Sequence, residues 1–308
     1  MAQRKRRVRN RLADWLVFAG VRTFAGVLHV FPIDLNLRTA RLIGTVWFHT
    51  IRRHRQRAMD HLRASFDGQY TEAELRRIAL RSFQQLVMMA MEVLFEPRLI
   101  KSWNWGRRAV LKDLDEAFDE LLGGRNAILV TGHYGSFELL GFLLATVGLE
   151  MVAVMRPLDN PYLNDYLLKC RYAAGLDLLY KKGAAYAAGQ VIETGRLLCF
   201  IADQNAGRKG LFVDFFGRKA STYRSIGLLA MHYEVPVIVG YARRTGDRFH
   251  YQIGVNRIIR PEEWRDRPDP LVWITQEYTR AIEDFVREDP TQYLWIHRRW
   301  KTRPPGEA

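Results

Sequence analysis

The chain of 308 residues carries 47 Lys and Arg against 33 Asp and Glu, a formal net charge of +14 at pH 7. With 48% hydrophobic and 12% aromatic residues, it is neither an intrinsically disordered nor a low-complexity protein. Its length predicts one large domain or two modest ones. Two cysteines, Cys170 and Cys199, make no disulfide framework, which favours a reducing compartment. The positive charge predicts an anionic partner: a nucleic acid, a membrane surface or an acidic protein.

The basic residues lie mainly at the two ends of the chain. Residues 1–63 hold fourteen Arg or Lys against three Asp or Glu, a net charge of +11, and residues 298–308 add +3. Residues 64–297 are therefore neutral overall. In the N-terminal segment, basic residues 4–11 precede an apolar stretch from Trp15 to Phe31, which Arg22 interrupts. A second apolar patch follows, and then four arginines between residues 52 and 57.

The first apolar stretch is marginal as a transmembrane helix, because a bilayer span needs about 20 mostly apolar residues. Its basic start resembles that of a signal peptide, but no clear small-residue cleavage site follows. We favour a helix lying in the membrane interface with its arginines at the headgroup level. A buried core helix with a basic solvent face and a single transmembrane span are the alternatives. In either membrane arrangement the flanking Lys and Arg predict a cytoplasmic N-terminus.

From residue 71 onward the hydrophobic period alternates between helical and strand-like. A helix is expected over residues 71–95, with Thr71 and Glu74 in a capping box and Pro97 after its end. Further helices are expected over 112–122, 137–147, 161–174, 184–194, 225–233 and 271–287. Buried strands are expected over 127–130, 151–155, 176–180, 197–201, 236–243 and 249–255.

Strands that alternate with helices indicate an α/β fold with a mainly parallel central sheet flanked by helices. No linker rich in Pro or Ser divides the chain after residue 64. We therefore predict a membrane-anchoring helical segment over residues 1–63 and a single α/β domain over residues 64–308.

The run from His133 to Glu138 carries the strongest local signal for chemistry. His133 follows a predicted buried strand, Gly135 allows a turn, Ser136 can cap the next helix, and Glu138 falls in its first turn. Open α/β sheets bind ligands at this end of their strands. The geometry allows the Glu138 carboxylate to hold one imidazole nitrogen while the other accepts a proton, a general-base pair. On spacing alone, a chance pairing of one His and one Glu stays open.

Several other classes of protein are disfavoured. The chain has no HExxH pattern and no Cys/His cluster, so no metal site is expected. Gly132 and Gly135 do not make the GxGxxG fingerprint, and no GxSxG elbow of a serine hydrolase is present. A nucleic-acid partner is disfavoured too, because the charge surrounds an apolar segment and no helix-turn-helix, zinc or RNP motif appears.

Five segments resemble, in consistent order, blocks of the bacterial lipid A biosynthesis late acyltransferases, members of the lysophospholipid acyltransferase-like superfamily. They are TGHYGSFEL (131–139), MRPLDNPYL (155–163), IADQNAG (201–207), FVDFFGRKAST (212–222) and QYLWIHRRWK (292–301). The first resembles the family's HxxxxE/D motif region, and the likeness covers about residues 55–303. Ser136 and Phe137 stand where many relatives have Asn and Trp, which leaves the acceptor open.

The resemblance implies a glycerolipid acyltransferase-like fold and the transfer of a fatty acyl chain from a thioester to a hydroxyl of a lipid A precursor. The donor is expected to be acyl carrier protein or acyl-coenzyme A, a co-substrate, and no cofactor is expected. The implied location is the cytoplasmic face of the bacterial inner membrane, where the basic ends suit an anionic leaflet, an anionic glycolipid and an acidic carrier protein. An acyltransferase of another glycolipid or phospholipid, such as a phosphatidylinositol mannoside, is the alternative.

The same resemblance suggests residue roles. His133 is the expected general base and Glu138 its partner, and backbone N–H groups near Gly135, or an arginine, are expected to stabilise the oxyanion. Arg171 is expected to hold a donor phosphate or an active-site carboxylate, and Asp203 to position Arg171 or the substrate, with structural roles open for both. The remaining expected substrate contacts, to anionic headgroups, are Arg156 and Arg218, for which plain surface charge is the alternative.

Overall fold

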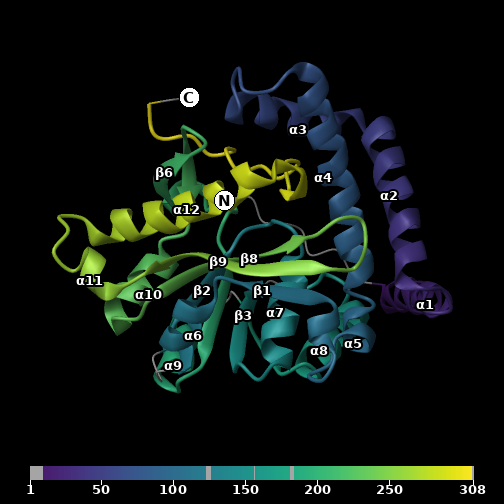
Figure 1. The fold of residues 1–308 in the computed structure, drawn as a ribbon, viewed down its shortest axis with the longest axis horizontal. Helices are drawn as coiled ribbons and strands as arrows, with labels where there is room; N and C mark the ends of the chain where they lie inside the picture. The colour runs from purple at the N-terminus through teal and green to yellow at the C-terminus, as the bar shows by residue number, and fades with distance from the viewer. Residues whose placement is uncertain (1–9, 123–125, 156, 181–183, 307–308) are drawn as a thin grey trace.

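The computed structural model describes residues 10–122, 126–155, 157–180 and 184–306 (Figure 1). Its centre is a seven-stranded sheet of mixed direction. The strands lie in the order β1 (Ala109–Lys112), β9 (Tyr251–Ile259), β8 (Val237–Arg244), β2 (Ile128–Thr131), β5 (Leu197–Ile201), β3 (Met151–Met155) and β4 (Leu176–Tyr180). All neighbouring pairs are parallel except β8 and β9, which are antiparallel. The predicted α/β fold with a mainly parallel sheet is therefore confirmed.

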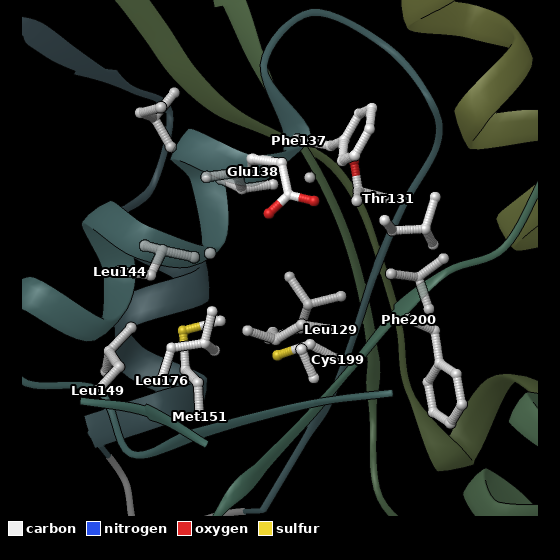
Figure 2. Close-up of a pocket in the computed structure, with 18 of the residues that line it drawn as sticks. Leu129, Thr131, Phe137, Glu138, Leu144, Leu149, Met151, Leu176, Cys199 and Phe200 are labelled. Atoms are coloured by element: carbon white, nitrogen blue, oxygen red, sulfur yellow. The ribbon is translucent and has the colours of Figure 1, made fainter. Parts of the chain in front are cut away.

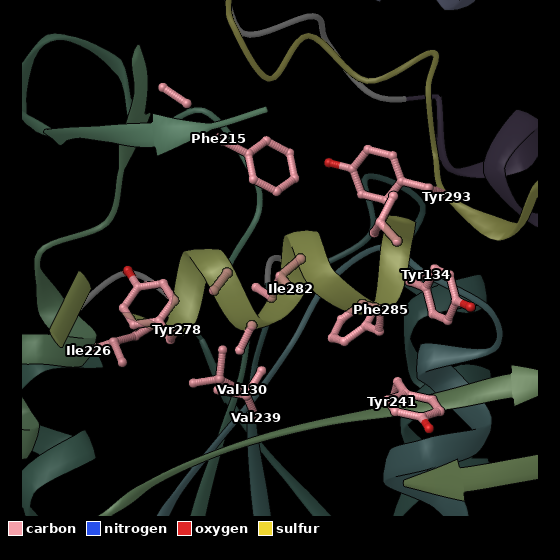
Figure 3. Close-up of a cluster of buried hydrophobic side chains, with 14 of the residues drawn as sticks. Val130, Tyr134, Phe215, Ile226, Val239, Tyr241, Tyr278, Ile282, Phe285 and Tyr293 are labelled. Carbon is pink, nitrogen blue, oxygen red and sulfur yellow. The ribbon is translucent and has the colours of Figure 1, made fainter. Parts of the chain in front are cut away.

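Helices cover both faces of this sheet, as its continuous apolar strands require. The helices α6 (Asp115–Leu122), α7 (Phe137–Thr146) and α8 (Pro161–Tyr172) lie on one face, and α9 (Ala184–Glu193), α10 (Ser225–Tyr233) and α12 (Pro270–Glu288) on the other. Successive residues of the central strand β2 alternate between the faces. Leu129 points toward α7 (Figure 2), and Val130 points toward α12 (Figure 3).

The long helix α12 packs onto the sheet through one apolar stripe. Ile274, Tyr278, Ile282 and Phe285 recur at helical spacing and are all buried (Figure 3). Burial of each such side chain stabilises the fold by about 1.5–3 kcal/mol. The stripe fixes how α12 lies on this face of the sheet. The chain after α12 returns over the end of β2, where Tyr293 forms a bridge with Tyr134.

The N-terminal helices pack against the rest of the chain. They are α1 (Arg11–Leu28), α2 (Ile33–Thr50), α3 (Arg52–Ser65) and α4 (Glu72–Glu92). The predicted capping box of Thr71 and Glu74 opens α4. Gly44 of α2 lies against the backbone of α4, where a Cβ atom would stand 2.6 Å from Gln84 Cα. The predicted domain boundary after residue 63 falls inside α3, whose Met59 and Leu62 join the same hydrophobic cluster as β2.

The outer surfaces of α1 and α2 are unusually apolar. They carry many of the exposed large hydrophobic side chains of the described residues: Leu12, Trp15, Leu16, Val17, Phe24, Val27, Leu35, Leu42, Ile43 and Val46. Within the part of the chain that the structure covers, no helix has the length and hydropathy that crossing a bilayer requires. An arrangement of these helices in the membrane interface stays a prediction.

Some elements differ from the predictions. The strand β1 was not expected, and the helix predicted from residue 112 begins only at Asp115, after Asp113 with a positive φ of 52°. The hairpin of β6 (Leu211–Phe215) and β7 (Arg218–Thr222) was missed because its turn, Phe216-Gly217, lacks the usual Asn-Gly or Asp-Gly signal. The described residues also form three 3-10 turns and two short helices: α5 (Glu96–Leu99), η1 (Trp105–Arg107), η2 (Gly207–Lys209), α11 (Pro261–Trp264) and η3 (Pro290–Gln292).

Candidate active site

His133 lies at the carboxyl end of β2, and its partner is Asp203. The register of the parallel strands β2 and β5 sets Thr131 opposite Ile201, so the residues two positions further on meet beyond the strand ends. Asp203 Oδ1 accepts a hydrogen bond from His133 Nδ1 at 2.6 Å, and Asp203 Oδ2 accepts one from the His133 backbone N–H at 2.9 Å. The carboxylate thus fixes the imidazole ring with its Nδ1 protonated and leaves Nε2 as the proton acceptor. The amide of Gln204 lies 3.0 Å from that Nε2.

Glu138 is not the hydrogen-bond partner of His133 that the spacing suggested. Its Oε2 instead accepts a hydrogen bond from Arg171 Nη2 at 2.5 Å, and both side chains are largely buried. The physical reason is the direction of the chain: Glu138 stands in the first turn of α7 on the side that faces α8, which carries Arg171. A second contact, from Arg171 Nη1 to Met155 Sδ at 2.9 Å, holds the guanidinium in place.

The turn between His133 and Glu138 depends on Gly135. Its φ of 57° is left-handed, and a Cβ atom there would lie 1.9 Å from the carbonyl oxygen of Ala242. The backbone N–H of Gly135 donates to Gln292 O, and that of Ser136 donates to Ala242 O. These two groups are therefore not free to bind an oxyanion, and the expectation of another backbone N–H near Gly135 or of an arginine stays a prediction. The side chain of Ser136 makes no capping hydrogen bond either, contrary to the prediction.

The electrostatics of the His133–Asp203 pair favour a charged imidazole. Burial alone would lower the pKa of His133, but the charge and hydrogen bond of Asp203, helped by the charge of Glu138, raise it above the ordinary value. Burial would raise the pKa of Asp203, yet the interactions with His133 hold it well below the usual range. A proton taken up by His133 is therefore stabilised on the imidazole, as a general base requires.

A second histidine, which the sequence did not single out, lies beside the first. The rings of His297 and His133 are nearly parallel, 8° apart in orientation and 5.7 Å between centroids. Burial lowers the pKa of His297 to about 4; the charge of Asp203 opposes this shift, and the charges of His133 and Arg299 add to it. His297 is therefore neutral at pH 7. On another side, the Phe137 ring meets His133 edge-on at 5.0 Å.

An apolar cavity of about 140 Å³ lies next to this site, between α6, α7 and the sheet (Figure 2). Thr131, Phe137 and Glu138 stand at one end of it, and Leu149 and Met151 at the other. The other polar groups in its lining are Arg171 and the thiol of Cys199. Burial raises the pKa of that thiol to about 12, so it is uncharged. A ligand for this cavity has a long apolar part and one polar end.

The other two predicted site residues lie apart from His133 or outside the described residues. Arg218 donates to Ser65 Oγ at 2.8 Å and lies over the Trp300 ring, with its Cζ 3.6 Å from the centroid. Burial lowers its pKa to about 10, and its contacts join β7 to α3, while its contact with an anionic headgroup stays a prediction. Arg156 lies outside the described residues. In the covered ranges, no group of three or more His, Cys, Asp or Glu is placed to hold a metal ion.

Comparison with known proteins decides the family. The sequence model of the family "Bacterial lipid A biosynthesis acyltransferase" matches residues 1–302. The chain belongs to this family. It is 26% identical over 306 residues to the lipid A biosynthesis palmitoleoyltransferase of Escherichia coli, with 96% of this chain and 94% of that protein covered.

Two further relatives support the same family. A lipid A biosynthesis acyltransferase of Haemophilus influenzae is 23% identical over 95% of this chain and 90% of its own length. The lipid A biosynthesis lauroyltransferase of Escherichia coli is 23% identical over 95% of this chain and 93% of its own length. The chain is accordingly an acyltransferase. The names of these relatives differ in the acyl group, so family membership leaves the length of the chain transferred unspecified.

Proposed function

We propose that this acyltransferase moves a fatty acyl chain from a thioester to a hydroxyl of a lipid A precursor at a membrane surface, with His133 as the general base. The observation that carries the proposal is the placement of His133. Its Nδ1 is held by the buried Asp203, and its ring contacts Phe137, which lines an apolar cavity with a polar end. The names of the relatives support the choice of lipid A as acceptor.

The proposed reaction needs no protein nucleophile. The acceptor hydroxyl gives its proton to Nε2 of His133 as its oxygen attacks the thioester carbonyl carbon. The resulting tetrahedral species collapses with cleavage of the C–S bond, and the departing thiolate takes the proton from the imidazolium. Asp203 remains a carboxylate throughout and stabilises the imidazolium through Nδ1. The amide of Gln204 contacts Nε2, and the acceptor hydroxyl displaces it from that position when it binds.

The Glu138–Arg171 pair takes a different part in the proposed mechanism. The charge of Glu138 contributes to the raised pKa of His133, although Glu138 does not contact the imidazole. Its hydrogen bond fixes the Arg171 guanidinium at the polar end of the cavity. We propose that Arg171 there orients the thioester end of the donor, which the cavity itself cannot do because its walls are apolar.

We propose that the acyl chain lies in the cavity between α7 and the sheet. Its methylene groups would run from Thr131 and Phe137 toward Leu149 and Met151. Each buried methylene contributes about 0.8 kcal/mol of binding free energy. The thioester carbonyl then lies at the polar end, within reach of an acceptor hydroxyl held at His133.

The membrane contact in this proposal is the apolar outer surface of α1 and α2. Trp15, Phe24 and Leu42 are about half exposed or more, and arginines flank them along both helices. Such a surface suits the headgroup and acyl boundary of an anionic leaflet. We place it on the cytoplasmic face of the inner membrane, where either acyl carrier protein or coenzyme A can deliver the acyl group.

The test is an acyl-transfer assay on vesicles that contain a lipid A precursor. Each donor, an acyl carrier protein thioester and a coenzyme A thioester of the same chain length, is supplied separately. Mass spectrometry is expected to find the precursor with one additional acyl chain. His133→Ala is expected to lower the rate by about 10³-fold or more, whereas the exposed His232→Ala serves as a matched control with full activity.

Two outcomes would overturn parts of this proposal. Transfer to a different glycolipid but not to the lipid A precursor would refute the acceptor. A near-normal rate of His133→Ala, with circular dichroism that matches the wild-type protein, would refute the general base.

A further inference from the structure

The polar end of the cavity contains a hydroxyl group without a hydrogen-bond partner. Thr131 is the last residue of β2 and is 8% exposed. Its Oγ1 is buried and makes no hydrogen bond, although the side chain lines the cavity beside Phe137 and Glu138 (Figure 2). A buried hydroxyl in this state has lost its hydrogen bonds to water without replacing them, which destabilises the protein. Such a group calls for a reason.

A bound ligand that accepts a hydrogen bond would explain the unpartnered hydroxyl of Thr131. If the acyl chain fills the cavity as proposed, the group that arrives at the polar end is the thioester carbonyl. A carbonyl oxygen only accepts hydrogen bonds, and it becomes an oxyanion when the acceptor attacks, so donors must face it. The neighbouring N–H groups of His133, Gly135 and Ser136 already donate to Asp203, Gln292 and Ala242. Thr131 Oγ1 is a donor that is not committed.

The position of Thr131 relative to the general base fits this role. Thr131 ends β2, and Gly132 after it faces Ile282 of α12, whereas Thr131 and His133 both lie toward Phe137 of α7. The hydroxyl of Thr131 points toward Phe137 in Figure 2, and the Phe137 ring contacts the His133 ring. One carbonyl group placed next to Phe137 can therefore be reached from both sides, by the hydroxyl and by a nucleophile held at His133.

We infer that Thr131 Oγ1 donates a hydrogen bond to the thioester carbonyl oxygen of the acyl donor and to the oxyanion that this oxygen becomes. The inference rests on the proposed function and adds a further catalytic residue to it. The hydroxyl keeps its own proton throughout. The only proton transferred in the attack is that of the acceptor, which moves to His133.

The experiment compares two substitutions that separate the hydroxyl from the methyl group. Thr131→Val keeps the shape and removes the donor, and it is expected to lower kcat on the order of 10²-fold with little change in the KM for the thioester. Its unfolding temperature is expected to equal or exceed that of the wild-type protein, because an unpartnered buried hydroxyl has been removed. Thr131→Ser keeps the donor and loses a buried methyl, so we expect most of kcat with a lower unfolding temperature.

We therefore expect Thr131→Ser to be less stable but more active than Thr131→Val. A purely structural role of Thr131 would make the less stable variant the less active one. Thr279→Val is the matched control, because Thr279 is also buried but its hydroxyl donates to Thr275 O. It is expected to retain kcat. Wild-type kcat in Thr131→Val, with an active wild-type enzyme, would overturn the role of Thr131 alone. A wild-type protein that transfers no acyl group would overturn the proposed function and this inference together.

Discussion

Two Arg–Glu ion pairs of this molecule differ in their surroundings. We expect one to stabilise the fold and the other to act in the reaction. Glu92 and Arg244 are 0% and 3% exposed and share two hydrogen bonds of 2.5 and 2.6 Å. Gln85 accepts from Arg244, and Tyr251 donates to Glu92, so this pair is enclosed by its own partners. Glu138 and Arg171 are joined by one bond and stand open to the cavity, with 24% and 11% of their side chains exposed.

The difference in exposure between the two pairs indicates which charged side chains can contact a substrate. A buried pair with satisfied hydrogen bonds holds elements together, because breaking it leaves a charge without a partner in a low-dielectric interior. A pair at the mouth of a cavity has a side free for a ligand. The His133–Asp203 pair combines both properties, because its carboxylate is 2% exposed and the second imidazole nitrogen lies against the Gln204 amide, where we propose that the acceptor hydroxyl binds.

The largest effect on kcat is expected when the charge of Asp203 beside His133 is removed. Asp203→Asn removes the charge that stabilises the imidazolium and is expected to lower kcat by about 10³-fold. Acyl transfer measured with saturating thioester would check this value. If Asp203→Asn kept more than a tenth of wild-type kcat, the carboxylate would be a structural partner of the His133 backbone rather than part of the base.

The next largest effect concerns stability. Glu92→Gln leaves the Arg244 charge buried without its counter-ion and is expected to lower the free energy of unfolding by about 3–5 kcal/mol, with kcat of the folded protein unchanged. Denaturant unfolding and an active-site-normalised rate would check both quantities. An unchanged unfolding midpoint would contradict the assignment of this pair to stability.

The matched substitution at the cavity is expected to show the reverse pattern. Glu138→Gln loses the charge-assisted hydrogen bond that orients Arg171, so we expect kcat to fall by about 10- to 100-fold. Because this pair is partly exposed, the unfolding midpoint should move much less than in Glu92→Gln. A similar loss of stability in the two variants would show that openness to the cavity does not distinguish them.

The pH dependence gives a smaller effect with a definite sign. The base must be neutral to accept a proton, and Asp203 raises the pKa of His133 above its ordinary value of 6.5. We therefore expect kcat/KM to rise with pH through a midpoint above 6.5. In Asp203→Asn burial dominates and lowers the pKa of His133, so the midpoint of the residual activity should move to lower pH. A shift to higher pH would contradict the attribution.

The smallest effect tests the cavity. Gly141 of α7 lines it, and a Cβ atom there would meet Leu176 Cδ2 at 3.5 Å, an ordinary contact. Gly141→Leu is therefore expected to fold and to shorten the preferred acyl chain, with a loss of about 4-fold for each methylene that no longer fits. A set of thioester donors of increasing length would measure this preference. An unchanged order of preference would place the acyl chain elsewhere.

The sequence was sufficient to predict most strands and helices of the sheet domain, because strands such as β2, β3 and β5 are short apolar runs and helices such as α4 and α12 show an apolar stripe. It also identified His133, Arg171 and Asp203 as candidates. It did not show that Asp203 rather than Glu138 holds His133, because spacing along the chain does not give the order of strands in a sheet. Once β2 and β5 are neighbours, the equal distance of His133 and Asp203 from the paired residues Thr131 and Ile201 makes the contact evident.

Other features needed the structure for different physical reasons. The stacking of His297 on His133 joins residues 164 positions apart, and no local pattern indicates such a contact. The partnerless hydroxyl of Thr131 is a property of its surroundings and not of its neighbours in the chain. The backbone N–H groups at Gly135 and Ser136 looked available in a strand-to-helix turn, but the chain returning after α12 and the end of β8 take both.

The contact between α1 and α8 has a mechanical consequence. Phe18 of α1 packs on Tyr162 and Tyr166 of α8, and Arg22 lies 4.5 Å from the Tyr166 ring centroid. Asn160, the N-cap of α8, also donates to the backbone of Asp14 in α1. Since Arg171 stands near the other end of α8, this one helix connects the contact with α1 to the polar end of the cavity. A tilt of α1 would therefore reach the Arg171 guanidinium through a helix and not through a loop.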